Sequence, residues 1–251
     1  MNIAAIIPAR YASSRLPGKP LAMIGDMTML HRTYLQVRKA VKNVWVATHD
    51  EIIADEVMRF GGRVIITSDC PRSGTERCAE AVSLLSDKPE IVINVQGDEP
   101  FISPADILAL IRKLQSDSTC QIATLIHKFD PDHGLQTLLS PDNPKVIIDD
   151  KGKALYFSRA VIPFVRDYPV EQWYKHADFY MHTGTYAFRT DSLLQLATLQ
   201  QSMLDSAESL EQLRWLSAGH PITTVLTDSY SISIDTPDDL DFANRLVKSM
   251  Q

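Results

Sequence analysis

Short apolar runs alternate along the first hundred residues with longer segments whose hydrophobic positions recur every three or four residues. The short runs are rich in Ile, Val and Ala, which is typical of buried strands, whereas the longer period is typical of amphipathic helices. The pattern predicts strands over Ile3–Ile7, Val44–Ala47, Arg63–Ile66 and Ile91–Val95. It predicts helices over Met29–Val41, Glu51–Phe60 and Gly74–Leu85. This alternation predicts an α/β fold, with a mostly parallel sheet covered by helices on both faces.

The second half of the chain has a less regular pattern. Two β-rich runs on either side of Gly152 predict a hairpin, and Phe179–Phe188 predicts a strand interrupted by Gly184. Helices are expected over Glu208–Ala218 and Asp238–Lys248. We expect residues 1–251 to form a single domain, with an inserted region at about 140–185 that serves as a lid or a dimer surface.

Composition limits the classes of function. The chain has 251 residues, of which 45% are hydrophobic, and its net charge is −6. This negative charge argues against a general nucleic-acid-binding surface. No apolar run approaches the length of a transmembrane helix, so no membrane insertion is expected. Three cysteines without CxxC spacing indicate reduced thiols, and we expect a soluble cytoplasmic protein.

A basic loop follows the first predicted strand. It carries Arg10, Arg15 and Lys19 within ten positions, interleaved with serines and with Gly18. In a parallel sheet, ligands bind beyond the carboxyl ends of the strands, where this loop lies. Small residues let backbone amides approach phosphate oxygens, and the three cations would neutralise a polyphosphate. The alternative is a solvated basic loop, but its position directly after a buried strand favours phosphate binding.

Two carboxylates follow other strand-like runs. Asp98 comes after Ile91–Val95 and a glycine, at the same expected edge of the sheet as the basic loop. An aspartate there suits Mg²⁺, a hard cation that takes oxygen ligands and bridges phosphates. We expect Glu99 to be a supporting or structural residue. Asp235 precedes Thr236 and Pro237 at the start of a helix, where helix capping and metal binding are equally good interpretations.

The segment Ser73-Gly74-Thr75-Glu76-Arg77 leaves two interpretations open. Ser73 is a suitable helix cap, and Glu76 would complete a capping box with it. Alternatively, the start of this helix contacts a nucleotide. The second half holds further polar candidates whose convergence on one pocket the spacing does not test.

Taken together, these motifs resemble the 3-deoxy-manno-octulosonate (KDO) cytidylyltransferase family, also called CMP-KDO synthetases. The similarity is strongest in Ile7–Leu21, and it continues in the same order through five other regions. These regions are Ser73–Arg77, Asn94–Pro100, Ala154–Ala160, Leu210–Arg214 and Asp235–Leu240. The resemblance implies a Rossmann-like fold, Mg²⁺ dependence, a homodimer and a transferase reaction. In that reaction CTP and an acidic 2-ulosonic sugar give CMP-sugar and pyrophosphate, for lipopolysaccharide synthesis.

The resemblance also implies roles for individual residues. The triphosphate and cytidine would be held by nucleotide-binding residues, namely Arg10, Arg15, Lys19, Ser73, Gly74 and Arg77. Asp98 and Asp235 would bind Mg²⁺ and, with Arg10 and Lys19, form the catalytic set. The sugar pocket would consist of Gln96, Arg159, Arg166, His182, Tyr186, Glu211 and Gln212. Arg159 is the candidate for the sugar carboxylate.

The chain departs from the family pattern at three places. Gly25–Met29 replaces a Gly-Lys-Pro stretch, and His49 precedes Asp50 where the family commonly has Ala-Thr-Asp. After His182 the sequence is Thr183-Gly184-Thr185-Tyr186, which we expect to add hydroxyls near the sugar. The acceptor is therefore KDO or a modified, for example amino-substituted, octulosonate.

We expect the anomeric hydroxyl of the sugar to attack the Mg²⁺-bound α-phosphate of CTP in line, helped mainly by positioning and charge neutralisation. Two alternatives stay open: a synthetase of the CMP-sialic-acid type or another sugar-nucleotide synthetase, and a non-catalytic nucleotide-binding regulator.

Overall fold

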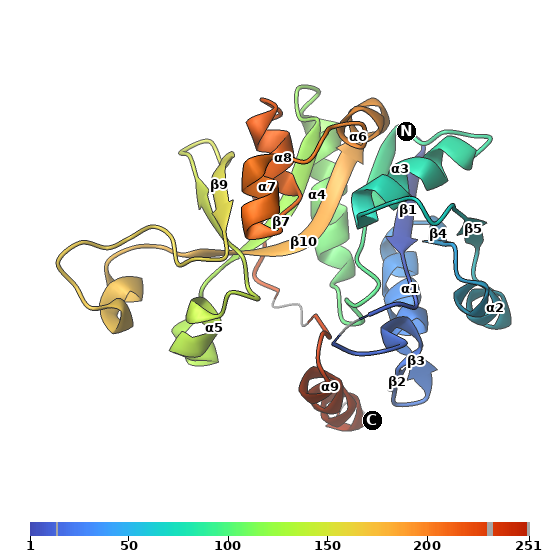
Figure 1. The fold of residues 1–251 in the computed structure, drawn as a ribbon, viewed down its shortest axis with the longest axis horizontal. Coiled ribbons are helices and arrows are strands. Elements are labelled where there is room, and N and C mark those ends of the chain that lie inside the picture. The colour runs from blue at the N-terminus through green and yellow to red at the C-terminus, as the bar shows by residue number, and fades with distance from the viewer. Residues whose placement is uncertain (14, 230–232, 250–251) are drawn as a thin grey trace.

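A mixed β-sheet forms the centre of the computed structural model, which describes residues 1–13, 15–229 and 233–249 (Figure 1). Along its main path the strands follow the order β11-β7-β10-β6-β1-β4-β5. Their bounds are Thr223–Leu226, Ile122–Lys128, Tyr180–Arg189, Ile91–Asn94, Ile3–Pro8, Asn43–Thr48 and Val64–Ile66, respectively. Ser14 of the basic loop, and Ser231 and Ile232 before Asp235, lie outside the described residues.

The parallel part of the sheet confirms the predicted alternation. β6, β1, β4 and β5 pair in parallel, as do β11 and β7. The expectation of a mostly parallel sheet holds along this path, but β10 lies antiparallel between β6 and β7. The sequence pattern did not predict β7 or β11. β7 pairs with β10 and with β11, and both pairings join segments that are far apart in the chain.

Helices cover both faces of the sheet. Successive strand residues point to opposite sides, so each face carries apolar side chains that the helices bury. In β1, Ala5 and Ile7 face one buried cluster and Ile6 faces the other. The first cluster includes residues of α1 (Met29–Ala40), α2 (Glu51–Arg59) and α4 (Pro104–Ser116). The second includes residues of α3 (Gly74–Leu84), α6 (Thr190–Leu196) and α8 (Gln212–Ser217).

The inserted region begins with α5 (Leu135–Leu139) and the hairpin of β8 (Lys145–Ile148) and β9 (Ala154–Ser158). Residues beyond β9 extend away from the sheet as an arm and return as β10 (Figure 1). At the other end of the chain, α9 (Pro237–Ser249) packs against the small sheet of β2 (Met23–Ile24) and β3 (Met27–Thr28). The side chain of Asn244 joins the two, because it accepts from the Gly25 amide at 2.9 Å and donates to the Met23 carbonyl at 3.2 Å.

One helix of the second half differs from the prediction at its start and agrees with it at its end. The helix expected over Glu208–Ala218 is wrong in its first turn: α7 (Met203–Glu208) ends there, and Ser209 is left-handed with φ 49°. α8 then begins at Gln212 and ends before Gly219, whose φ of 84° fits the predicted C-terminal glycine. Among the described residues, none of the helices is long and apolar enough to cross a membrane.

Candidate active site

The direction of the strands brings the predicted site residues to one edge of the sheet. β1, β4 and β6 are parallel neighbours, so the loops that follow Pro8, Thr48 and Asn94 emerge side by side. β10 runs antiparallel to β6, and its first half therefore reaches the same edge. Finally, the amide of Ile234 donates to the carbonyl of Asp98 at 3.0 Å, which brings the segment before α9 to the end of β6.

Contacts with neighbouring loops hold the basic loop in place. The amide of Tyr11 donates to Oδ2 of Asp50 at 2.7 Å. Gly18 has a φ of 65°, and a Cβ built on it would lie 3.2 Å from the Tyr11 ring. Glycine is suited to both the backbone conformation and this close approach. The loop then turns through Lys19–Leu21, a short 3-10 helix that directs Lys19 toward Asp98.

Lys19 lies between the two predicted metal ligands. Its Nζ donates to Oδ2 of Asp98 and, at 2.8 Å, to Oδ1 of Asp235. Its side chain is 16% exposed. Burial alone would lower the pKa of Lys19, but the charges and hydrogen bonds of the two carboxylates raise it above its ordinary value. Oxygens of Asp98 and Asp235 therefore converge on a single cation.

Arg15 connects this cluster to the second half of the chain. One terminal nitrogen of its guanidinium lies 3.1 Å from Oδ1 of Asp235, and the other lies 3.3 Å from Oδ1 of Asp142. Sequence reasoning did not single out Asp142. No local pattern distinguishes it from other loop carboxylates, because 127 positions separate it from Arg15.

Capping of α9 is carried out by the neighbours of Asp235. The Thr236 hydroxyl accepts from the Asp239 amide at 3.2 Å, and the Asp239 carboxylate accepts from the amides of Asp235 and Thr236 at 3.1 and 2.8 Å. This reciprocal arrangement is a capping box. It leaves the side chain of Asp235 to contact Lys19 and Arg15. Capping is thus carried out by Thr236 and Asp239, and metal binding by Asp235 stays a prediction.

Ser73 caps α3 as predicted, since its hydroxyl oxygen accepts from the Glu76 amide at 3.1 Å. The capping box itself is not formed, because the Glu76 carboxylate accepts from the amide of Arg72 and forms ion pairs with Arg72 and Arg214. The Ser73 hydroxyl donates to Oε1 of Glu211 at 2.5 Å. Burial raises the pKa of Glu211, against the effect of this hydrogen bond.

A hollow beyond β1 and β6 is lined by every residue predicted to bind the nucleotide. These residues are Arg10, Arg15, Lys19, Ser73, Gly74 and Arg77. Asp98 and Asp235 also line it. Arg77 is buried, and its guanidinium donates to the side chain of Thr67 and to the carbonyl of Ser68.

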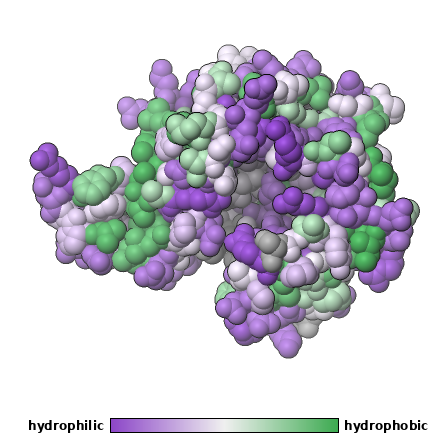
Figure 2. All heavy atoms as spheres, viewed as in Figure 1, coloured by the Kyte–Doolittle hydropathy of each residue, from purple (hydrophilic) through white to green (hydrophobic). Residues whose placement is uncertain are grey.

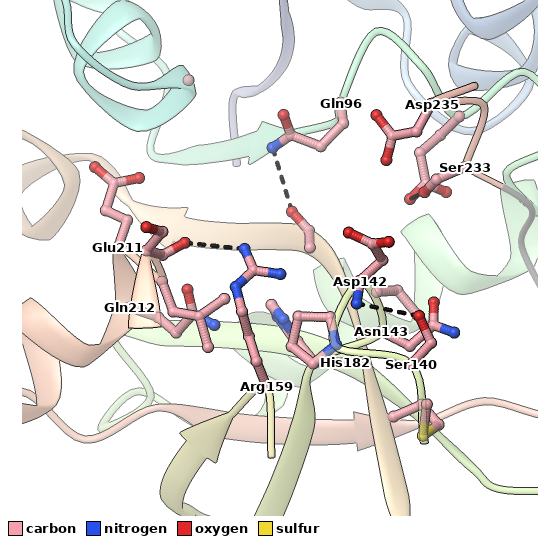
Figure 3. A pocket seen from close by; sticks show the side chains of 18 of the residues that line it. Gln96, Ser140, Asp142, Asn143, Arg159, His182, Glu211, Gln212, Ser233 and Asp235 are labelled. Carbon is pink, nitrogen blue, oxygen red and sulfur yellow. Dashed lines mark hydrogen bonds between the residues drawn. The ribbon is translucent and has the colours of Figure 1, made fainter. Parts of the chain in front are cut away.

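A second hollow adjoins the first and contains six of the seven residues predicted to bind the sugar (Figure 3). They are Gln96, Arg159, His182, Tyr186, Glu211 and Gln212. Arg15, Gly74, Gln96 and Asp235 line both hollows, so the two form one continuous cleft. Figure 2 shows the molecule hollowed near its centre, with hydrophilic side chains around the opening.

An irregularity in β10 shapes the floor of the second hollow. The pairing with β7 shifts between His182 and Tyr186, and Gly184 between them has a φ of 77°. The Gly184 carbonyl consequently accepts from Nε2 of Gln96 at 3.3 Å. Thr183 lines the hollow, but Thr185 is fully buried beneath it. The expectation that Thr185 adds a hydroxyl to the sugar site is therefore wrong, because its side chain has no exposed surface and does not line the hollow.

Two buried polar groups of this hollow are unpaired. Nε2 of Gln212 has no hydrogen-bond partner within the described ranges, and the Tyr186 hydroxyl lies near Thr124 without forming a hydrogen bond of good geometry. Each side chain is only 5% exposed. Buried polar groups without partners are costly and rare in proteins, so they point to a polar ligand at this position.

The two predicted arginines differ in placement. Arg159 lines the cleft, and its guanidinium donates to the carbonyls of Pro141, Glu208 and Ser209 at 2.8, 2.7 and 3.2 Å. Arg166 lies on the arm, where its side chain is 90% exposed and pairs with Asp167. The structure does not bring Arg166 to this cleft, because the chain between β9 and β10 leaves the sheet.

Lys145 is a further residue that the sequence did not single out. It is fully buried in β8, and its Nζ donates to the Ser140 carbonyl at 2.8 Å. Burial, together with the charge of Arg159, lowers the pKa of Lys145 to about 8. Lys145 and Arg159 thus hold the backbone of the segment that presents Asp142 to Arg15.

The chain is similar to several known proteins. Residues 4–224 match the family described as cytidylyltransferase. A 3-deoxy-manno-octulosonate cytidylyltransferase of Bacteroides thetaiotaomicron is 45% identical over 99% of both chains. The protein of the same name from Cytophaga hutchinsonii is 46% identical over 96% of this chain and 95% of its own.

A solved structure extends this similarity to three dimensions. It is that of CMP:2-keto-3-deoxy-manno-octonic acid synthetase complexed with CTP, which is 36% identical to this chain. The two superpose with a TM-score of 0.90 over 100% of both chains.

Proposed function

Because this chain belongs to the cytidylyltransferase family, we propose that it transfers the cytidylyl group of CTP to 3-deoxy-manno-octulosonate, giving CMP-KDO and pyrophosphate. The observation that carries the proposal is the continuity of the two hollows through Arg15, Gly74, Gln96 and Asp235. A nucleotide in one hollow and a sugar in the other would meet at these residues. The names of the relatives support the acceptor, and the CTP-bound relative supports the nucleotide.

Charge neutralisation is the main task of the nucleotide side. Arg10, Arg15 and Lys19 line that hollow, and they would hold the triphosphate while the anomeric hydroxyl attacks the α-phosphorus in line. Two anions, the sugar carboxylate and the triphosphate, must come together for this reaction. Cations placed beforehand at their junction lower the cost of that approach.

The carboxylates fit a divalent cation. Oxygens of Asp98 and Asp235 already converge on the ammonium of Lys19, which shows that the pair accommodates a positive charge. In the described part of the chain no group of three or more His, Cys, Asp or Glu side chains is arranged around one point. Mg²⁺ usually takes one or two carboxylates and completes its shell with phosphate oxygens and water. When bound, the ion would supply additional positive charge to the α-phosphate.

Arg159 is the proposed partner of the sugar carboxylate. Three of the five N–H groups of its guanidinium are used by backbone carbonyls, so two remain for a ligand. The carbonyl contacts fix the plane of the guanidinium, which suits recognition of a carboxylate.

The rest of the proposal follows from the family. KDO or an amino-substituted octulosonate is the acceptor, and the product serves lipopolysaccharide synthesis in the cytoplasm. Residues 1–251 act as one domain, and two copies form a homodimer in which the arm carrying Arg166 is the candidate contact surface.

The direct test is release of pyrophosphate from CTP and Mg²⁺ with a panel of 2-ulosonic acids. We expect turnover with octulosonates. Activity with a nonulosonic acid alone would replace this acceptor with one of the sialic-acid type. CTP binding without pyrophosphate release for every acceptor would instead indicate a non-catalytic regulator.

A second test addresses the carboxylates. Asp98→Ala at saturating Mg²⁺ should reduce turnover by about 100-fold or more, since a bound metal supplies several kcal/mol of transition-state stabilisation. Asp55→Ala is the matched control, because Asp55 is exposed on α2 and lies outside the cleft. Turnover near the wild-type value in Asp98→Ala would contradict the metal assignment.

A further inference from the structure

Thr124 lies beneath the sugar side of the cleft and contacts two groups at once. It is fully buried in β7. Its Oγ1 is 2.8 Å from the carbonyl oxygen of Thr185 and 2.9 Å from Nε2 of His182. Both distances are those of good hydrogen bonds.

The chemistry of these groups assigns the proton between them. A carbonyl oxygen only accepts, so the single hydroxyl proton of Thr124 is donated to Thr185. Toward His182, therefore, the Thr124 oxygen accepts. Nε2 of His182 must carry a proton to donate this bond, which selects one of the two neutral tautomers or the doubly protonated ring.

Burial decides between these forms. It lowers the pKa of His182 to about 3, and the nearby His127 acts in the same direction. The ring is therefore neutral at neutral pH. It packs against Phe157 and Tyr186, with ring centroids 4.9 and 5.3 Å away, so its plane is held from two sides.

The remaining ring nitrogen is available to a ligand. His182 lines the sugar side of the cleft, and its Nδ1 makes no hydrogen bond with the residues that the structure describes (Figure 3). With its proton on Nε2, the neutral ring has a lone pair on Nδ1. This atom can accept a hydrogen bond but cannot donate one.

We propose that Thr124 holds His182 in the neutral form protonated on Nε2, so that Nδ1 accepts a hydrogen bond from a hydroxyl or ammonium group of the acceptor sugar. The identity of this ligand rests on the proposed function, whereas the state of the ring does not. An acceptor-only Nδ1 disfavours a carboxylate, so the sugar carboxylate must face Arg15 or Arg159 and the hydroxylated part must face His182.

The ring state is tested by nitrogen-15 NMR of the full chain labelled at histidine, with the His182 signals assigned from their loss in His182→Asn. Between pH 5 and 8 we expect a protonated Nε2 and a bare Nδ1. Thr124→Val removes the acceptor and should shift His182 toward mixed tautomers. Thr185→Val is the matched control, because it removes a buried hydroxyl that has no partner within the described residues. A wild-type His182 protonated on Nδ1, or cationic at pH 7, would overturn the inference.

Kinetics test the ligand. Thr124→Val should raise the KM for the sugar about 2- to 10-fold, the range expected for one neutral hydrogen bond, and leave the KM for CTP unchanged. His182→Asn retains an acceptor near Nδ1 and should keep more sugar affinity than His182→Leu. Equal sugar KM values for these two variants would refute the role of Nδ1. If no acceptor supports pyrophosphate release while the NMR result holds, the proposed function fails and the ring assignment stands.

Discussion

Nζ of Lys19 lies 2.8 Å from Oδ1 of Asp235, although 216 positions separate the two residues. The same ammonium contacts Asp98, so segments from the beginning, middle and end of the chain meet at one charge. Two carboxylates so close would repel each other without a cation between them. Lys19 therefore neutralises the pair, and a divalent cation held by both carboxylates would compete with it for the same oxygens.

Lys19→Met separates these two roles. In the free protein, loss of the competing ammonium should make Mg²⁺ stabilise the fold more than in the wild type, measured as a larger rise in Tm without CTP. Turnover should fall by about 100-fold or more, because a cation at the triphosphate is lost. Lys151→Met, in the hairpin turn, is the control. An unchanged response of Tm to Mg²⁺ would show that Lys19 does not compete for these carboxylates.

Asp239→Ala tests how Asp235 is positioned. The change removes the acceptor for the amides of Asp235 and Thr236, and loss of a cap costs about 1 kcal/mol of the free energy of unfolding. We expect kcat to fall about tenfold as well, because catalysis is sensitive to small displacements of a positioning carboxylate. Asp238→Ala, one residue away in the same first turn and without these contacts, should leave kcat unchanged and lose only the small stabilisation of its charge at the helix start. Equal kcat values for the two variants would show that the cap does not position Asp235.

The sequence predicted the parallel half of the fold well because buried strands and amphipathic helices have local periods. The bounds of β1, β4 and β6 agree with the prediction within one or two residues. β7, β11 and the antiparallel place of β10 are different, since they depend on pairing between distant segments. The break at Ser209 depends on a single left-handed residue that is not a glycine, which local pattern does not signal.

The candidate site shows the same division. Asp98 and the basic loop were expected at one edge because parallel strands end together, and their contact through Lys19 agrees with that. The partnership of Arg15 with Asp142 and the buried Lys145 could not be predicted, since both depend on how the inserted region folds back. Whether the predicted residues bind their ligands stays a prediction.

Gly18→Ala should damage the basic loop in particular. A left-handed φ costs an alanine about 1–2 kcal/mol, and the new Cβ would also meet the Tyr11 ring at 3.2 Å. We expect lower stability in urea and a higher KM for CTP. Gly61→Ala has nearly the same backbone cost, with φ 75° but no atom within 4 Å of the Cβ. Gly61→Ala should lose similar stability and keep the wild-type KM for CTP. If its KM for CTP rose as much as that of Gly18→Ala, the rise would reflect a general loss of stability and not the basic loop.

Lys145 makes stability depend on pH in the alkaline range. Burial lowers its pKa to about 8 in the folded protein, against an ordinary value of 10.5. Between these values the unfolded chain binds more protons than the folded one, so the free energy of unfolding contributed by this group rises with pH. Each pKa unit corresponds to about 1.4 kcal/mol, so the gain across the roughly 2.5 units between these values is at most about 3.5 kcal/mol. Below pH 8 both states are protonated and the contribution is constant.

Lys145→Met should therefore remove the part of this rise that Lys145 contributes. The measurement is urea unfolding of both proteins at pH 7, 8, 9 and 10. We expect the free energy of unfolding of the wild type, relative to that of Lys145→Met, to increase with pH. Methionine also leaves the Ser140 carbonyl without its donor, which adds a cost independent of pH and so separable from the titration. Lys151→Met again provides the control, and a difference between wild type and Lys145→Met that stays constant from pH 8 to 10 would show that Lys145 does not titrate in this window.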